Sequence, residues 1–127
     1  MSDTISYCSV ALECPDASAL ARFYAEIITN GQVTYADEWW ATVKGPSGRL
    51  DFQTAPEYVA PTWPDSRSSM QMHLDFDVDD LDATEARVLA AGATKFEYQP
   101  GNHFRVYADP AGHPFCLTTM DVPGDAD

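Results

Sequence analysis

Residues 71–92, QMHLDFDVDDLDATEARVLAAG, decide the fold because they join a strand to a capped helix. Polar and apolar residues alternate over 71–78, which is the period of a half-buried strand. Asp80 is a favourable N-cap for the helix that follows, and Gly92 is a typical residue for its end. Three short β-rich runs, TKFEY, FRVY and PFCLTT, complete residues 94–119. This half of the chain is therefore predicted to be β-α-β-β-β.

The first half of the chain shows the same order of elements. An alternating stretch, a helix capped at Asp16 and three β-rich runs follow one another between residues 6 and 53. Asp16 and Asp80 are 64 positions apart, and the turns GPSG (45–48) and DPAG (109–112) have the same spacing. Because repeats fix architecture, we expect one domain over residues 1–127, with modules at about 5–54 and 70–120.

Each module is expected to be a four-stranded sheet with a helix on one face. Two such sheets set side by side predict an α+β fold, in which two βαβββ modules form a cupped, open, barrel-like mixed sheet with the helices outside. The cup is a natural place for a small ligand. The linker TAPEYVAPTWPDSRSSM (54–70) is rich in Pro and Ser and is predicted to be an ordered loop over a surface.

The composition limits the partners and the compartment. Twenty acidic and seven basic residues give a net charge of −13, which repels nucleic acid phosphates and anionic lipids. The sequence has no apolar run long enough to span a bilayer and no basic, apolar signal segment at its start. Its three cysteines lack CxxC spacing. We therefore expect a cytoplasmic protein with reduced thiols and with neither nucleic acid nor a membrane as a partner.

Three stretches resemble the vicinal oxygen chelate superfamily, which includes glyoxalases, bleomycin-resistance proteins and extradiol dioxygenases. They are SVALxCxD…FY from residue 9, HLDFDVDDL from residue 73 and DPAGHPFCL from residue 109. Within the superfamily, the chain is similar to glyoxalase-like domain proteins over residues 5–119. The resemblance implies the paired-module fold and makes a homodimer the expected assembly.

The resemblance also implies a ligand set in the metal-dependent members, with one ligand, usually His or Glu, on the first and fourth strands of each module. Carried over to this chain, these positions are Ser9, Phe52, His73 and Cys116, and both pairs are again 64 residues apart. Three of the four depart from the family pattern, and one imidazole with one thiol falls short of the three protein ligands of a catalytic metal. We therefore predict no metal and no other cofactor, with His73 as the candidate ligand should a metal bind.

Three roles remain open for Cys116. As a small, weakly polar residue, it would line the ligand pocket. Together with His73, helped by His103 or His113, it would instead bind a soft metal ion. As a nucleophile, its thiolate would need a nearby base or cation that lowers its pKa, and His73 could serve.

The predicted ligand pocket contains six residues, which are Phe52, Trp63, His73, Arg105, Tyr107 and Cys116. The aromatic members could stack on a flat ligand, and Trp63, in PTWP, would be either a lid or a buried plug. His73 has the strand parity of the cavity side and could exchange a proton with a ligand, or it could be structural. Arg105 would recognise a carboxylate or phosphate if it faced inward, and would pair with an acid if it faced outward.

These observations predict a metal-independent protein that binds a small hydrophobic or aromatic molecule, such as a drug or metabolite that it sequesters. The alternative is a metal-dependent enzyme of the superfamily, that is, a lyase, isomerase or dioxygenase. Whether the chain catalyses a reaction stays open at this point, because fold resemblance alone cannot choose between these classes.

Overall fold

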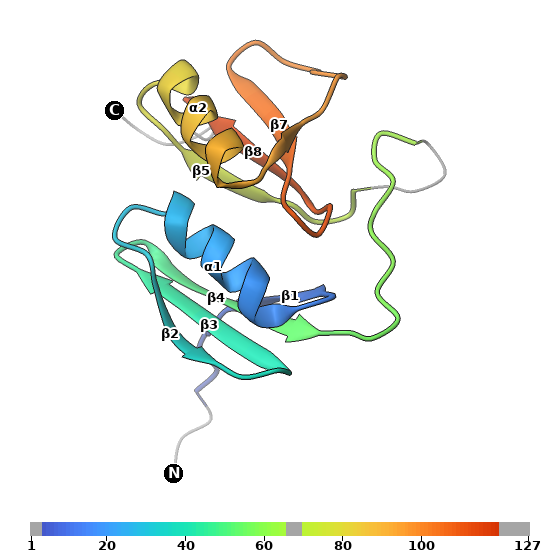
Figure 1. Ribbon diagram of the computed structural model, residues 1–127. Helices are drawn as coiled ribbons and strands as arrows, with labels where there is room; N and C mark the ends of the chain where they lie inside the picture. The colour runs from blue at the N-terminus through green and yellow to red at the C-terminus, as the bar shows by residue number, and fades with distance from the viewer. Residues whose placement is uncertain (1–3, 66–69, 120–127) are drawn as a thin grey trace. The chain divides into compact units, whose positions relative to one another are not determined.

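A computed structural model describes residues 4–65 and 70–119 of the chain. These residues belong to two compact units, the first ending at Tyr58 and the second beginning at Val59. Each unit contains one βαβββ module (Figure 1). The α+β class and the internal repeat are therefore confirmed, while the union of both modules in a single domain stays a prediction.

The elements follow the predicted order. The first unit contains β1 (Val10–Cys14), α1 (Ala17–Ile27), β2 (Gln32–Ala36), β3 (Trp40–Gly45) and β4 (Gly48–Thr54). The second unit contains β5 (Leu74–Asp77), α2 (Leu81–Ala91), β6 (Thr94–Lys95), β7 (Phe104–Ala108) and β8 (Pro114–Thr118). Both predicted N-caps are confirmed, because Asp16 accepts from the Ala19 N–H and Asp80 from the Ala83 N–H.

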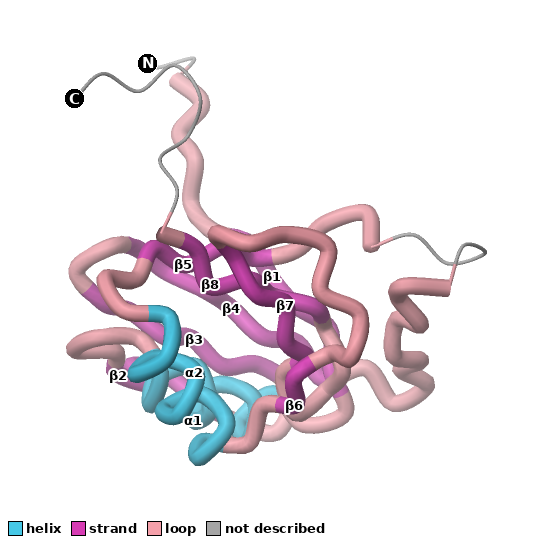
Figure 2. Tube along the Cα trace, turned by 90° about the horizontal axis from the view of Figure 1, so that it is seen from above, coloured by secondary structure: helices cyan, strands magenta, loops and turns pink. Residues whose placement is uncertain are grey.

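The two sheets have the same topology. In the first, β1 pairs in parallel with β4, and β3 and β2 follow in antiparallel order. In the second, β5 pairs in parallel with β8, followed by β7 and β6. Each strand order is linear, so neither sheet closes on itself. One helix lies on one face of each sheet (Figure 2), and we call the other side the helix-free face.

The core of each unit lies between its helix and its sheet. In the first unit, Tyr24 of α1 stacks on Phe52 of β4 with ring centroids 5.6 Å apart. In the second unit, Tyr107 of β7 stacks on Phe115 of β8 at the same centroid distance. All four rings are fully buried, so these side chains mark the helix-covered face of each sheet.

Strand β6 is shorter than the run TKFEY suggested. The side-chain amide of Gln99 accepts the backbone N–H of Val106 and donates to its carbonyl, both at 2.9 Å. These are backbone groups of β7 with which a longer β6 would pair. The Phe96 N–H still donates to the Val106 carbonyl at 3.2 Å, but the Gln99 amide takes the place of the Phe96 carbonyl as the acceptor of the Val106 N–H.

The hairpins that lead into the last strands differ by one residue. In the first unit, Gly45 pairs with Gly48, which leaves a two-residue loop. In the second, Ala108 pairs with Pro114, and the Asp109 N–H donates to the His113 carbonyl, so three residues remain in the loop. The extra residue shifts the last strand of the second module by one position relative to the repeat.

This shift corrects the pairing of Phe52 with Cys116 that the spacing of 64 residues suggested. Asp51 is paired with Ala11 between β1 and β4, and Cys116 is paired with Asp75 between β5 and β8. Asp51 is therefore the structural counterpart of Cys116. Phe52 points in the opposite direction, toward α1, because side chains alternate along a strand.

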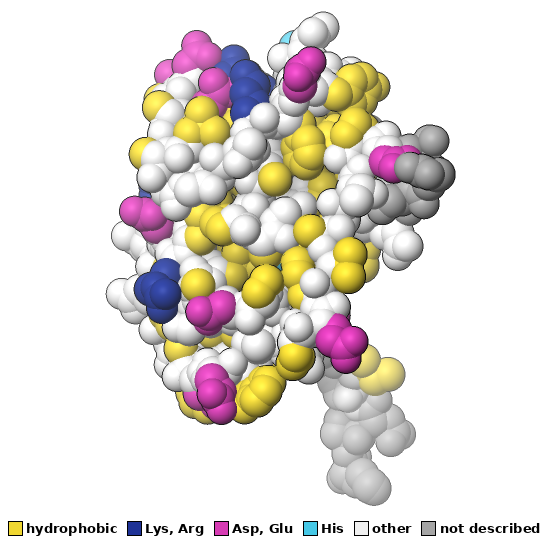
Figure 3. Space-filling model, turned by 45° about the vertical axis from the view of Figure 1, so that its right-hand side comes forward, with side chains coloured by type: hydrophobic (Ala, Val, Ile, Leu, Met, Phe, Trp, Pro, Cys, Tyr) yellow, Lys and Arg dark blue, Asp and Glu magenta, His cyan; other side chains and the backbone are white. Residues whose placement is uncertain are grey.

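Acidic side chains are mainly at the surface, and some of them are visible in Figure 3. Among the described residues, Asp51 and Asp109 are the only buried acids. No helix in the described part of the chain is long and apolar enough to cross a membrane.

The position of Phe52 in the core leads to a first prediction. Phe52→Ala should lower the free energy of unfolding by about 3–5 kcal/mol, because it removes a buried ring and leaves a cavity. Gln53→Ala, the adjacent exposed position of β4, should change it by no more than about 0.5 kcal/mol. Urea unfolding followed by circular dichroism measures both, and equal costs would contradict the assigned direction of Phe52.

Candidate functional site

His73, Asp75 and Cys116 meet on the helix-free face of the second sheet. His73 Nε2 lies 3.2 Å from Asp75 Oδ1, and one ligand atom from each of the three residues lies within 4.8 Å of the other two. Asp75 and Cys116 are direct partners between β5 and β8, and His73 shares the parity of Asp75. Asp75 is not among the six residues of the predicted pocket, although it has the same strand parity as His73 in the sequence.

Cys116 is held as a neutral thiol in this cluster. Its side chain is almost fully buried, with 4% exposed. Burial, and then the charge and hydrogen bond of Asp75, raise the pKa of the Cys116 thiol to about 12. Because a thiolate is the nucleophilic form, this environment argues against a nucleophilic cysteine.

The other two histidines lie outside this cluster. His113 Nδ1 is 2.8 Å from Asp109 Oδ2 within the β7–β8 hairpin, so its ring supports the turn. His103 is exposed, and its carbonyl accepts from the Thr119 N–H at 3.1 Å. The geometry therefore gives no support to the idea that either one helps His73 and Cys116 to bind a soft ion.

Asp51 forms a second polar centre, on the helix-free face of the first sheet. The Ser9 and Thr42 hydroxyls both donate to its carboxylate, Thr42 at 2.6 Å. Arg49 Nε lies 3.0 and 3.2 Å from the two carboxylate oxygens. Burial by itself would raise the pKa of Asp51, but the hydrogen bonds from Arg49, Ser9 and Thr42 outweigh it and hold the pKa below its ordinary value. Asp51 is thus a buried carboxylate with several donors.

The donors of the two units differ in how well they suit a metal ion. At the family's ligand positions in the first unit, Asp51 is already bound by the Arg49 guanidinium, whose charge repels a cation, so this pair does not fit a metal. In the second unit, His73, Asp75 and Cys116 offer nitrogen, oxygen and sulfur, which Zn²⁺ accepts. The Cys116 thiol would have to lose its proton on binding.

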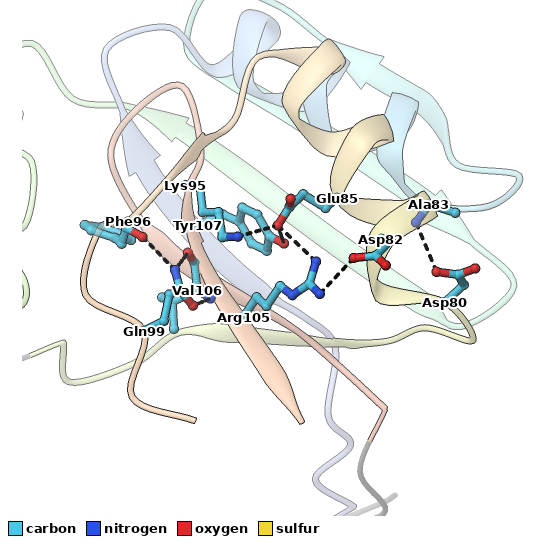
Figure 4. A network of polar contacts seen from close by, with 10 residues as sticks. All are labelled: Asp80, Asp82, Ala83, Glu85, Lys95, Phe96, Gln99, Arg105, Val106 and Tyr107. Carbon is cyan, nitrogen blue, oxygen red and sulfur yellow. Dashed lines mark hydrogen bonds and ion pairs between the residues drawn. The ribbon is translucent and has the colours of Figure 1, made fainter. Parts of the chain in front are cut away.

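Arg105 and Tyr107 point toward α2 and away from the helix-free face. Arg105 Nη2 and Nη1 donate to Asp82 at 2.9 Å and to Glu85 at 3.2 Å, and the Tyr107 hydroxyl donates to Glu85 at 2.7 Å (Figure 4). Lys95 completes the network with Nζ 2.9 Å from the same Glu85 oxygen. Burial, followed by Glu85, raises the pKa of Tyr107 far above its ordinary value. Of the two alternatives for Arg105, pairing with an acid is the one observed.

Trp63 packs on the segment that follows β6. Its ring lies 4.9 Å from Phe96 in an edge-on arrangement and 5.8 Å from Tyr98. Nearby, a Cβ at Gly112 would come within 2.9 Å of the Ala60 Cβ, so the linker also contacts the β7–β8 turn. These contacts favour the plug over the lid for Trp63. Residues 66–69 of the predicted linker lie outside the described residues.

The six residues of the predicted pocket are thus directed to different places. His73 and Cys116 have their ligand atoms within 4.8 Å of each other. Phe52, Arg105 and Tyr107 face the helices of their own units, and Trp63 lies in the linker. The ligand pocket itself stays a prediction, and His73, Asp75 and Cys116 are its best supported members.

Paired βαβββ modules with polar residues on the helix-free faces of their sheets define a protein of the vicinal oxygen chelate superfamily. The family model of the glyoxalase-like domain matches residues 9–118. The chain therefore belongs to the glyoxalase-like domain family. No curated protein matches it.

Similar solved structures show the same fold. A glyoxalase/bleomycin resistance protein from Albidiferax ferrireducens is 20% identical, with a TM-score of 0.62 over 88% of this chain and 96% of that one. The fosfomycin resistance protein FosX from Mesorhizobium loti is 16% identical, with a TM-score of 0.65 over 96% of each chain. The oxidase ChaP-H2 is 24% identical, with a TM-score of 0.67 over 94% of this chain and 97% of that one. At these identities the likeness shows the fold alone.

The environment of Cys116 predicts that its thiol reacts slowly with alkylating reagents. At mildly alkaline pH, iodoacetamide should alkylate exposed Cys8 readily and Cys116 far more slowly, because Cys116 is buried and its pKa is raised to about 12. Asp75→Asn should shift the pH–rate profile of Cys116 to lower pH, since the variant removes a negative charge beside the thiol. Peptide mass spectrometry separates the two cysteines. An unshifted profile in the variant would contradict the role of Asp75.

The lowered pKa of Asp51 predicts a pH-dependent contribution to stability. A depressed folded-state pKa stabilises the fold above the unfolded-state value of about 3.9, and this stabilisation is lost as the pH falls through the folded-state pKa. Asp51→Asn should therefore cost about 2 kcal/mol at neutral pH, because the charge-assisted bonds from Arg49, Ser9 and Thr42 are weakened.

The deficit of Asp51→Asn should shrink below about pH 4, where the wild-type carboxyl also gains a proton. Urea unfolding across the pH range measures it, with Glu13→Gln as the control for an exposed acid of the same sheet. A deficit that is independent of pH would rule out the ionised carboxylate as its source.

Proposed function

We propose that this protein binds a small hydrophobic or aromatic molecule without a metal ion, and that it sequesters that molecule. The observation that carries the proposal is the buried, neutral thiol of Cys116 at a position where metal-dependent members of the superfamily hold a ligand. The Arg49–Asp51 pair supports it, because it occupies the equivalent position of the first module with an existing ion pair. A homodimer in the cytoplasm is part of the same proposal.

The helix-free face of the second sheet offers both apolar and polar contacts to such a ligand. Cys116 and its β7 partner Val106 are the buried apolar residues beneath this face, with 4% and 1% exposed. The side chains of His73 and Asp75 are 35% and 60% exposed and can reach a ligand with hydrogen bonds. The arrangement suits a mainly apolar molecule with a polar group at one edge.

A ligand screen before and after exhaustive chelation tests this function. Flat aromatic metabolites and antibiotics should include compounds that raise the melting temperature equally in both preparations. His73→Ala should weaken the binding of such a compound by on the order of tenfold, the effect of one lost hydrogen bond. His103→Ala, at an exposed histidine outside the cluster, serves as the control. Binding that disappears on chelation and returns with Zn²⁺ would refute metal independence.

A metal-dependent enzyme is the second candidate, and the ligand atoms of His73, Asp75 and Cys116 within 4.8 Å of one another favour it. These three residues would hold the ion. The chemistry supplied by Zn²⁺ held there would be that of a Lewis acid.

Cobalt binding tests the second candidate through a readout other than activity. If the cluster binds metal, Co²⁺ should produce a thiolate-to-cobalt charge-transfer absorption that is lost in Cys116→Ala and kept in Cys8→Ala. If several equivalents of Co²⁺ produce no such absorption, the metal-dependent enzyme is ruled out as a candidate.

A further inference from the structure

Two of the seven basic residues of the chain lie directly opposite each other on the first sheet. Lys44 of β3 is the antiparallel partner of Arg49 of β4. Direct partners project from the same face, with Cβ atoms about 4.5–5.5 Å apart. Thr42 and Asp51, two residues along each strand, form the next such pair and are hydrogen bonded to each other. All four side chains therefore belong to the helix-free face.

Arg49 is oriented by its contact with Asp51. Its Nε lies within 3.2 Å of both carboxylate oxygens, which fixes the guanidinium plane. In residues 4–65 and 70–119 neither Nη nitrogen has a hydrogen-bond partner, and the side chain is 36% exposed. The guanidinium thus keeps donors for a further partner while one edge holds it in place.

Among the described residues of the first unit, the charges around Lys44 leave a local positive excess. Asp51 balances Arg49, whereas exposed Lys44 has no ion-pair partner among the described residues. Its neighbour on β2 is the neutral Gln32. Glu13 shares the face but pairs with Gln53, four residues along β4 from Arg49 and therefore about 13 Å away. Like charges directly opposite each other destabilise a sheet. An anion bound between Lys44 and Arg49 would therefore reduce their repulsion.

We propose that Lys44 and Arg49 form a binding site for a carboxylate. A guanidinium offers parallel N–H donors that match the two oxygens of a carboxylate, and a lysine ammonium adds a point charge. With Asp51 included, the three side chains carry one net positive charge, which a carboxylate neutralises and a phosphate dianion exceeds. All three side chains belong to the first unit, and the proposed site contains no residue of the cluster of His73, Asp75 and Cys116.

An NMR titration of the full chain with benzoate, benzamide and inorganic phosphate tests the site at constant ionic strength. Benzoate should shift the backbone amide signals of residues 42–51 in a saturable way. Benzamide, which has the same ring without the charge, should leave these signals in place, and phosphate should bind more weakly than benzoate.

Variants separate recognition by charge from the stability of the fold. Lys44→Gln should raise the dissociation constant for benzoate by on the order of tenfold, the effect of one lost charge-assisted bond. Arg49→Lys keeps the charge beside Asp51 but removes the fork of donors, and should also weaken binding. Arg22→Gln is the matched control, because Arg22 lies on α1 of the same unit and bonds Ser18 at 2.8 Å.

Equal shifts with benzamide, an unchanged dissociation constant in Lys44→Gln, or tighter binding of phosphate than of benzoate would overturn the carboxylate site. Shifts that benzoate causes in amide signals of the second unit would instead report on the small-molecule site proposed for His73, Asp75 and Cys116. Failure of one site therefore remains distinguishable from failure of the other.

Discussion

The buried carboxylate of Asp109 is the constraint on which the second module depends. It accepts the N–H groups of Ala111 and His113 at 2.9 and 3.0 Å, and its other oxygen lies 2.8 Å from the His113 ring. These bonds hold a hairpin with one residue more than its counterpart in the first module. The longer hairpin sets the register in which Cys116 lies opposite Asp75. Burial is the main cause of the raised pKa of the Cys116 thiol, and Asp75, which this register places beside it, raises the pKa further.

Equivalent positions of the two modules have consequently acquired different chemistry. In the first, Asp51 remains charged because Arg49 and two hydroxyls donate to it. In the second, Cys116 remains protonated because it is buried beside a carboxylate. Neither state is that of an open metal ligand, although His73, Asp75 and Cys116 together have the right donor types for Zn²⁺. An ion could bind at this cluster only with loss of the Cys116 proton, which burial and Asp75 disfavour.

The sequence predicted the elements of the fold more reliably than the direction of its side chains. The caps at Asp16 and Asp80 and the alternation in each first strand have local causes, so they were visible in the repeat. The extra loop residue cannot be recognised from the repeat, because GPSG and DPAG match in spacing. The additional residue of the second hairpin comes after DPAG, at His113. One residue reverses the face of every side chain in a strand, so the spacing of 64 residues predicts Phe52 at the position that Asp51 occupies in the structure. The partners of Arg105 and Tyr107 on α2 depend on tertiary contacts that no local pattern contains.

Elemental analysis of protein purified without a chelator or a histidine tag, alongside His73→Ala, tests the central claim most directly. If Cys116 keeps its proton and the site works without metal, neither preparation should contain a transition metal at a level near one ion per chain. Metal near one ion per chain in the wild type, lost in His73→Ala, would contradict the account and make the metal-dependent enzyme the better description.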